Sequence, residues 1–202
     1  MTSPSSFPKY PSDAAADCPV TRLETDRLIL RAISPADRDG YVAFFTSDRS
    51  RFAGGPLERT DAWRWFAAEI GHWRIHGWGM FAVAEKTAPD VTLGIVGPWF
   101  PDGWPEREVG WLLWPQGEGR GIAAEAARAC LDHVFRDLHW PTAVSYIAPD
   151  NHRSIALAER LGAVRDPSAR PHTPGDLVYR HAPPRNVRFG PRTVQVVQKD
   201  TP

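Results

Sequence analysis

The chain has few cysteines and no excess charge of either sign. Only two of its 202 residues are cysteines. Cys18 falls in an N-terminal arm and Cys130 on the apolar face of an expected helix, so no disulfide is expected. This usage is typical of a reducing cytoplasm. Basic and acidic residues number 24 each, which makes the formal net charge zero. Neutrality argues against nucleic-acid and membrane-surface binding, because proteins of both classes are usually basic.

Long apolar runs, repeats and low-complexity tracts are also absent from the sequence. No apolar stretch approaches the ~20 residues of a transmembrane helix. The segment Met1–Asp17 lacks the basic start and the apolar run of a secretion signal. A hydrophobic content of 42% and a charged content of 24% are ordinary for a soluble globular protein.

The length fits one domain with a tail at each end. We expect an N-terminal arm over 1–22, the domain over 23–182 and a C-terminal arm over 183–202. Thr193–Gln198 in the last arm has strand character. We expect it to pair with a sheet edge or with a second subunit of a homodimer.

The spacing of apolar residues predicts a mixed α/β fold. Strands are expected at Arg27–Ala32, Met80–Glu85, Leu93–Phe100, Glu106–Trp114, Thr142–Ile147 and Leu177–His181. Helices are expected from a capping box at Ser34, from Thr60 to about His76, from Ile122, and over Asn151–Leu161. The second helix is expected to bury Trp63, Phe66, Ala67, Ile70 and Trp73. The strand–helix–strand unit around Ile122 should give one parallel strand pair, whereas the hairpins should be antiparallel.

The most informative segment is Glu108–Glu125, where an apolar strand runs through a glycine-rich turn into an alanine-rich helix. Gly117, Gly119 and Gly121 let the backbone come close to an anion, and the start of a helix favours negative charge. The nucleotide-triphosphate loop is excluded because its lysine and hydroxyl residues are missing. The dinucleotide fingerprint is excluded because Ile122 fills its last glycine position. The segment therefore predicts a phosphate-bearing cofactor of another kind.

Three segments together resemble the GNAT acetyltransferases. Glu118–Ala123 resembles the acetyl-CoA loop of that family, written Gln/Arg-x-x-Gly-x-Gly/Ala. Asn151–Ala163 resembles the helix after the fifth strand, which begins with Asn-x-x-Ser in the ribosomal-protein N-terminal acetyltransferases, and Leu23–Arg31 resembles the first strand of that branch. The resemblance spans roughly residues 23–181. It implies the acyl-CoA N-acyltransferase fold, a mixed sheet flanked by helices, with a splayed parallel strand pair that admits the pantetheine arm.

The loop departs from the family pattern at one position. Glu118 stands where the family has glutamine or arginine, although a register starting at Gln116 satisfies the pattern literally. We prefer the register from Glu118 because it keeps the family's spacing from Pro115. An acid beside a pyrophosphate is unfavourable unless its side chain points away.

The resemblance implies which residues bind the cofactor. They are Leu113, Glu118, Gly119, Arg120, Gly121, Ile122, Ala123 and Asn151. The amides of Gly119, Gly121 and Ala123 would bind the pyrophosphate, and an amide near Leu113 would contact the pantetheine and the oxyanion. Arg120 would reach a phosphate oxygen or remain solvated, and Asn151 caps its helix in either case.

Acetyl transfer to an amine needs a group that takes the amine's proton and a proton for the departing thiolate. The resemblance implies that Glu108 takes the first proton through a water; an ion pair with Arg107 or Arg31 is the alternative. Ser154 would supply the second proton or simply hydrogen-bond the backbone. Tyr146 is the nearest alternative donor, but a strand residue of this type is expected in the core.

The sequence contains no compact cluster of metal ligands. His72 and His76 are spaced four residues apart, but the glutamate of a zinc-protease signature is missing, and we expect them on a partly exposed helix flank. Nine tryptophans are present. Trp63, Trp73 and Trp111 are expected in the core. The side chains expected to contact the acceptor are Arg51, Phe52, Trp99 and Trp104.

The sequence therefore predicts a cytoplasmic N-acetyltransferase in which a primary amine attacks acetyl-CoA directly. The acceptor is either a protein N-terminus or a small-molecule amine. An open polar groove would favour the peptide, and a closed aromatic pocket around Trp99 and Trp104 would favour the small amine. The alternative is a catalytically silent acyl-CoA-binding or interaction module, which Glu118 and the absence of an obvious tyrosine acid support.

Overall fold

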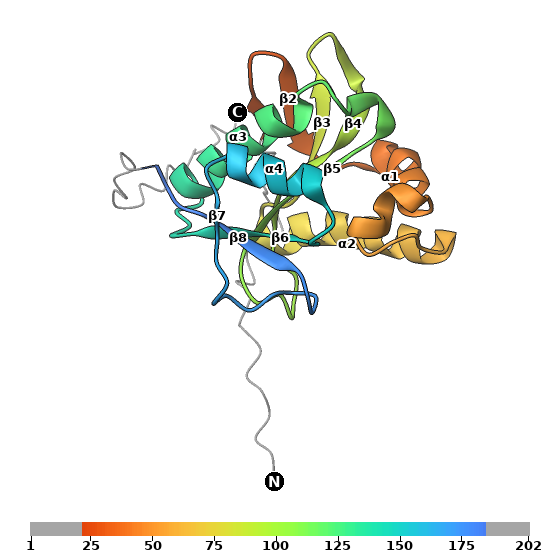
Figure 1. Cartoon of the computed structure of the whole chain (residues 1–202). Helices are drawn as coiled ribbons and strands as arrows, with labels where there is room; N and C mark the ends of the chain where they lie inside the picture. Colours follow the sequence, from red (N-terminus) through yellow and green to blue (C-terminus); the bar gives the residue numbers. More distant parts are fainter. Residues whose placement is uncertain (1–21, 185–202) are drawn as a thin grey trace.

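The computed structural model describes residues 22–184, and one eight-stranded sheet runs through them (Figure 1). The strand order is β1-β2-β3-β4-β5-β6-β8-β7, and β5 and β6 are the parallel pair. The strands are β1 Leu23–Glu24, β2 Leu28–Ala32, β3 Phe81–Glu85, β4 Ala88–Trp99, β5 Glu108–Leu113, β6 Ala143–Ile147, β7 Val164–Arg165 and β8 Leu177–His181. The expected mixed α/β fold is confirmed. Most of both arms lies outside the described residues, and so do Cys18 and Thr193–Gln198.

Four α-helices and three short 3-10 turns pack on this sheet. They are α1 Arg38–Phe45, α2 Arg59–His76, α3 Ile122–Arg136, α4 His152–Arg160, η1 Pro35–Asp37, η2 Asp48–Phe52 and η3 Pro115–Gly117. In Figure 1, α3 and α4 lie together in front of the sheet, and α1 packs beside α2 away from them. None of the helices in residues 22–184 has the length and apolar character needed to cross a membrane.

The capping residues and apolar spacing in the sequence predicted the starts of the helices correctly, with one exception. The capping box at Ser34 is present, with Pro35 at the first position of η1, and α1 follows directly. The helix α3 buries the apolar face that the sequence predicts, including Ile122, Ala126 and Cys130. Thr60 was expected to cap α2, but the N-cap is Glu58, two residues earlier, and the helix begins at Arg59.

The buried face of α2 differs from the expected one. Trp63 was expected in the core but is 54% exposed, and Ala67 is also exposed. The buried residues of the helix are Ala62, Phe66, Glu69, His72 and Trp73. Two of these are polar and find hydrogen-bond partners in neighbouring elements, so an apolar pattern cannot reveal this face.

The sheet differs from expectation at its turns and ends. The strand β4 begins at Ala88, so the turn from β3 is tighter than the expected Thr87–Asp90. The two-residue strands β1 and β7 were not expected, and β7 interrupts the expected loop at Val164–Asp176. Both add short antiparallel edges to the strands beside them.

A buried ion pair ties β2 to η1 and β4. The carboxylate of Asp37 accepts two hydrogen bonds from Arg31, each 2.8 Å long, and further ones from Thr92 and from the Ser34 backbone amide. Burial would raise the pKa of Asp37, but the hydrogen bonds and the nearby guanidinium outweigh it and lower that pKa from its ordinary value of 3.8. The charged form of Asp37 therefore stabilises the fold.

We predict that Asp37→Asn lowers the free energy of unfolding at neutral pH by about 3 kcal/mol, because Arg31 loses its charged partner. A depressed folded-state pKa contributes stability above the unfolded value and loses it as pH falls. The variant should therefore lose stability less steeply than the unsubstituted protein below about pH 4. Urea unfolding at several pH values measures both effects.

The matched control is Asp39→Asn, because Asp39 pairs with Arg38 at the exposed surface. That variant should leave the stability nearly unchanged, because solvent screens an exposed ion pair. An Asp37 variant as stable as this control would contradict the importance of the buried pair.

Candidate functional site

The parallel strands β5 and β6 diverge after a single point of contact. Glu108 and Val144 are their one pair of register partners within residues 22–184. Beside it, the Val144 amide donates to the Arg107 carbonyl at 3.0 Å, and the Ser145 hydroxyl donates to the Val109 carbonyl at 2.7 Å. The other edge of β5 stays paired with β4 as far as Leu113. The stretch 110–113 therefore presents a backbone edge without a strand on one side, which confirms the splayed pair.

The side chains at this opening come from β5 and the first turn of α4. The indole Nε1 of Trp111 donates to the hydroxyl of Ser154 at 3.1 Å. The side chain of Asn151 accepts from the Ser154 backbone amide at 3.2 Å and so caps α4, as expected. Because the Ser154 oxygen accepts from Trp111, its own proton is directed to another acceptor. The Ser154 proton is therefore available to an acceptor other than Trp111.

The glycine turn lies between the end of β5 and the start of α3. Gly119 and Gly121 have φ angles of +72° and +76°, a conformation that favours glycine. A Cβ at Gly117 would lie 2.8 Å from the Leu93 carbonyl oxygen, whereas one at Gly119 would meet no heavy atom within 4 Å. Gly117 therefore allows close packing against β4, and the backbone at Gly119 faces open space.

Gly121 is the N-cap of α3 and supplies no side-chain cap. The first amides of an α-helix have no partner inside the helix and carry partial positive charge. Ile122 and Ala123 occupy this first turn. The arrangement of glycine turn and helix start is suited to bind an anion such as a phosphate.

The charged side chains of the turn point to different partners. Glu118 pairs with Arg49 of η2 and, at 3.1 Å, with Arg153 of α4. Arg120 pairs with Glu85 at 2.6 Å, so its guanidinium is engaged and not simply solvated. The acid of the turn is thus neutralised by two arginines that the local sequence does not reveal.

Glu108 lies at the start of β5, where the two parallel strands still touch. Its carboxylate accepts from the Trp104 indole at 2.7 Å. Burial is the main cause that raises the pKa of Glu108 to about 7, and the charge of Asp176 adds to it, while the hydrogen bonds from Trp104 and the Tyr146 amide oppose it. A carboxylate with a pKa near neutrality can accept a proton from an amine.

The arginines considered as ion-pair partners of Glu108 are engaged elsewhere. Arg31 binds Asp37, and the guanidinium of Arg107 lies 5.3 Å from the centre of the Trp140 ring. No ion pair to Glu108 occurs among residues 22–184. The ion-pair alternative therefore finds no support in this geometry.

A second buried acid, Glu69 of α2, lies near Glu108 and was not anticipated from the sequence. It is 6% exposed, and one carboxylate oxygen, Oε2, has no hydrogen-bond partner in the described part of the chain. Burial raises the pKa of Glu69 to about 8, a hydrogen bond from Tyr41 lowers it, and the charge of Glu108 raises it further. An isolated glutamate in a helix reads as a surface residue, so no sequence signal identified it.

His72 follows Glu69 by one helical turn and is buried, contrary to the expected exposed flank. Its Nδ1 lies 3.0 Å from the Trp78 carbonyl oxygen, and its Nε2 accepts from the Phe100 amide at 3.1 Å. Burial is the main cause that lowers the pKa of His72 to about 4. The ring is therefore neutral near pH 7 and cannot balance the charge of the two acids.

Aromatic rings surround the acids. The ring of Trp99 stacks on His72 at 4.5 Å, and Trp104 stacks on His172 at 3.7 Å. The rings of Trp99 and Trp104 meet edge to face. The two tryptophans therefore belong to one aromatic group beside Glu108.

The other expected residues lie elsewhere. The guanidinium of Arg51 lies over the Phe52 ring on η2, whereas Trp99 ends β4 and Trp104 lies in the loop before β5. The hydroxyl of Tyr146 accepts from the Glu106 amide at 3.0 Å. Burial raises the pKa of Tyr146 to about 12, so its hydroxyl stays protonated near neutral pH.

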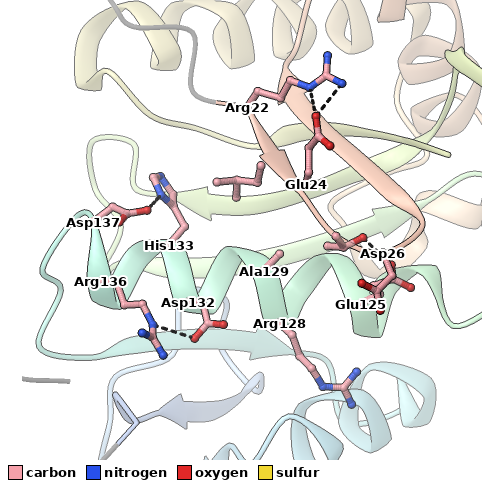
Figure 2. A pocket seen from close by; sticks show the side chains of 12 residues that line it. Arg22, Glu24, Asp26, Glu125, Arg128, Ala129, Asp132, His133, Arg136 and Asp137 are labelled. Carbon is pink, nitrogen blue, oxygen red and sulfur yellow. Dashed lines mark hydrogen bonds and ion pairs between the residues drawn. The ribbon is translucent and has the colours of Figure 1, made fainter. Parts of the chain in front are cut away.

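A separate groove lies between β1 and α3 (Figure 2). Its charged side chains pair largely with one another: Arg22 with Glu24, Arg136 with Asp132, and His133 with Asp137. This groove contains none of the residues of the splayed strands or the glycine turn. We therefore place the functional site at the splay.

The fold and site define an acyltransferase of the acyl-CoA N-acyltransferase class. Residues 27–164 match the family profile described as an acetyltransferase (GNAT) domain. The chain therefore belongs to the GNAT acetyltransferase family and is an acyltransferase. The family uses acetyl-CoA.

Three solved structures illustrate the relationship. An acetyltransferase from Agrobacterium tumefaciens is 40% identical, with a TM-score of 0.76, over 80% of this chain and 94% of that one. A GNAT-family acetyltransferase from Bordetella pertussis is 30% identical, with a TM-score of 0.67, over 80% and 99% of the two chains. RimL, a ribosomal-protein alpha-N acetyltransferase in complex with coenzyme A, is 16% identical, with a TM-score of 0.63, over 80% and 98%, and this match shows the fold alone.

We predict that the free energy of unfolding falls as pH rises from about 4.5 to about 8. The folded-state pKa values of Glu108 and Glu69 are raised to about 7 and about 8, so the folded protein binds more protons than the unfolded chain in this window. Glu69→Gln should reduce this loss by roughly 3 kcal/mol, because glutamine needs no proton to be neutral. Urea unfolding across the window measures the slope.

The matched control for this measurement is Glu58→Gln, at an exposed position just before α2. In this variant the free energy of unfolding should change with pH as it does in the unsubstituted protein. If Glu69→Gln and the control have the same slope, Glu69 does not bind a proton in the folded state.

Proposed function

We propose that this protein transfers an acetyl group from acetyl-CoA to a primary amine by direct attack, in the cytoplasm. One observation carries the proposal: the unpaired edge of β5 runs from Glu108, at the point where β5 and β6 touch, toward the glycine turn. The base and the anion-binding turn therefore lie at the two ends of one opening. The buried free thiol of Cys130 is compatible with a reducing compartment.

The cofactor would occupy the opening between β5 and β6. The amides of Gly119, Gly121 and Ala123 would bind the pyrophosphate at the start of α3, with Ile122 beside them. The backbone of β5 up to Leu113 would pair with the pantetheine amides in place of a strand. Asn151 lies at the other wall, on α4. RimL, which shares the fold at low identity, is solved in complex with coenzyme A, and this supports the kind of cofactor.

We assign one residue or backbone group to each chemical role. The cofactor supplies an acetyl thioester, whose C–S bond breaks as the new C–N bond forms. Glu108 would take the proton of the attacking nitrogen, directly or through a water, and a β5 amide near Leu113 would donate to the developing oxyanion. Ser154 would give its proton to the departing thiolate and regain one from solvent. This hydroxyl is better placed than Tyr146, which already interacts with Glu106.

The geometry favours a small amine over a peptide N-terminus. The rings of Trp99 and Trp104 form a compact aromatic group beside the acids. The expected acceptor contacts Arg51 and Phe52 lie instead on η2, whose Arg49 pairs with Glu118 of the glycine turn. Binding of acetyl-CoA without turnover of any amine would favour the silent acyl-CoA-binding module instead.

The proposal predicts that acetyl-CoA binds with a micromolar dissociation constant and that Gly119→Trp and Gly121→Trp abolish binding. Both substitutions place a large side chain where the pyrophosphate would lie. Glu118→Gln should tighten binding about three- to tenfold at low salt, because it removes a negative charge and frees Arg49 and Arg153. Isothermal titration calorimetry measures all three variants.

The matched control for the tryptophan variants is Gly103→Trp. Gly103 also has a positive φ angle and open space around its Cβ position, but it lies in the loop between β4 and β5. It should leave binding unchanged. Failure of the unsubstituted protein to bind acetyl-CoA would refute the proposal.

The role of Glu108 predicts a pH dependence of kcat/KM. A base acts in its deprotonated form, so activity should be lost as pH falls through a pKa of about 7 and level off above it. Glu108→Gln should lower kcat/KM by about a hundredfold or more and remove this acid limb. Initial rates with a fixed amine from pH 6 to 9 test it. An unchanged acid limb in the variant would assign the titration to another group.

A further inference from the structure

Glu69 is a buried acid that the proposed transfer reaction does not use. It lies in α2 and is 6% exposed, and its Oε2 has no hydrogen-bond partner among residues 22–184. Its other oxygen is available to the hydroxyl of Tyr41, which hydrogen-bonds this carboxylate. Buried carboxylate oxygens are nearly always partnered in folded proteins. The unpartnered oxygen of Glu69 therefore lacks a donor, which a ligand could supply.

The fold orients Glu69 toward Glu108. Trp99 and Glu108 are direct partners in the antiparallel ladder of β4 and β5, so their side chains project from the same face of the sheet. The ring of Trp99 stacks on His72, one helical turn beyond Glu69 on the buried face of α2. The two acids therefore face the same space between α2 and the sheet, and their charges interact.

A glycine leaves room beside the acids. On the face of β5 that carries Glu108, the next residue is Gly110. A Cβ there would lie 3.6 Å from Glu108 Oε1 and 3.7 Å from Met80 Cε. Any larger side chain at this position would fill the space next to the carboxylate. Gly110 therefore keeps the approach to Glu108 open from the same side as Glu69.

No ion pair to Glu69 or Glu108 occurs among residues 22–184. His72 is neutral near pH 7, Arg31 is bound to Asp37, and Arg107 lies over Trp140. Asp176 adds a third acid whose charge raises the pKa of Glu108. A cationic ligand would therefore bind in this space more tightly than a neutral or anionic one. The rings of Trp99 and Trp104 also favour a cation.

We propose that Glu69 anchors the second cationic group of a small diamine acceptor, while Glu108 faces the amine that is acetylated. The inference rests on the proposed function and specifies its substrate class. Two carboxylates that are not hydrogen-bonded to each other can each bind one end of such a molecule. A monoamine leaves Glu69 unpartnered, and a peptide N-terminus offers one cation where the site has two acids.

The experiment compares putrescine, a diamine, with butylamine, which has the same carbon chain and one amine. In the unsubstituted protein, kcat/KM for putrescine should exceed that for butylamine by about tenfold or more. Glu69→Gln should raise KM for putrescine about tenfold, leave its kcat within about twofold, and leave butylamine unchanged. Glu108→Gln should instead lower kcat for both amines. A serine-initiated tripeptide completes the panel.

Two further variants separate anchoring from a structural role. Glu69→Asp keeps the charge and should retain part of the preference for putrescine. Tyr41→Phe removes the hydrogen bond to Glu69 but no charge, and should retain the preference fully. A Glu69→Gln variant that lowers kcat/KM equally for both amines, or an unsubstituted protein that prefers butylamine or the tripeptide, would overturn the inference.

Calorimetric titration of the two amines in the presence of coenzyme A separates the two hypotheses. It shows whether the diamine inference fails or whether the proposed transferase activity fails. Turnover without a preference for putrescine overturns the diamine inference and keeps the transferase. Putrescine binding that depends on Glu69, but without turnover, overturns the transferase and keeps the anchoring role. Neither binding nor turnover overturns both.

Discussion

The single contact between β5 and β6 is the constraint on which the rest of the site depends. Glu108 and Val144 pair, the Ser145 hydroxyl bonds the Val109 carbonyl, and beyond that point the strands separate. Backbone amides inside a protein need partners. An edge of a central strand that is left open toward its neighbour is therefore a binding surface for an extended molecule. The glycine turn and the start of α4 lie at this opening because both follow directly from the two diverging strands.

The burial that shapes the fold also sets the chemistry of its acids. Glu108 is in register with Trp99, and Glu69 occupies the buried face of α2, so both carboxylates are withdrawn from water. Asp37 is also buried, yet its hydrogen bonds and Arg31 lower its pKa, whereas burial raises the pKa of the other two. The pKa shifts differ in direction because only Asp37 is paired with a cation. An acid that stabilises the fold is paired with a cation, as Asp37 is with Arg31. A buried acid without such a partner can exchange protons or bind a cationic ligand.

Features with a local cause were predictable from the sequence. The glycines at 119 and 121, the cap at Asn151 and the buried stripe of α3 depend on residues a few positions apart. The buried face of α2 was not predictable, since Glu69 is bonded by Tyr41 of α1 and His72 by the backbone of Trp78 and Phe100. Arg120 likewise bonds Glu85, which is distant in sequence. Such contacts exist only after the chain has folded.

Glu118 shows how a distant contact can compensate for an unfavourable local choice. From the sequence alone, an acid in an anion-binding turn weakens the case for a phosphate ligand. In the folded protein Arg49 and Arg153 converge on that acid from η2 and α4. The turn with its two arginines thus carries a net positive charge, and a bound phosphate would compete with Glu118 for the same guanidinium groups. These pairs are exposed and solvent-screened, so the exchange costs little. The turn can therefore keep an acid and still favour an anion, because its affinity rests on backbone amides and on two arginines whose charge exceeds that of Glu118.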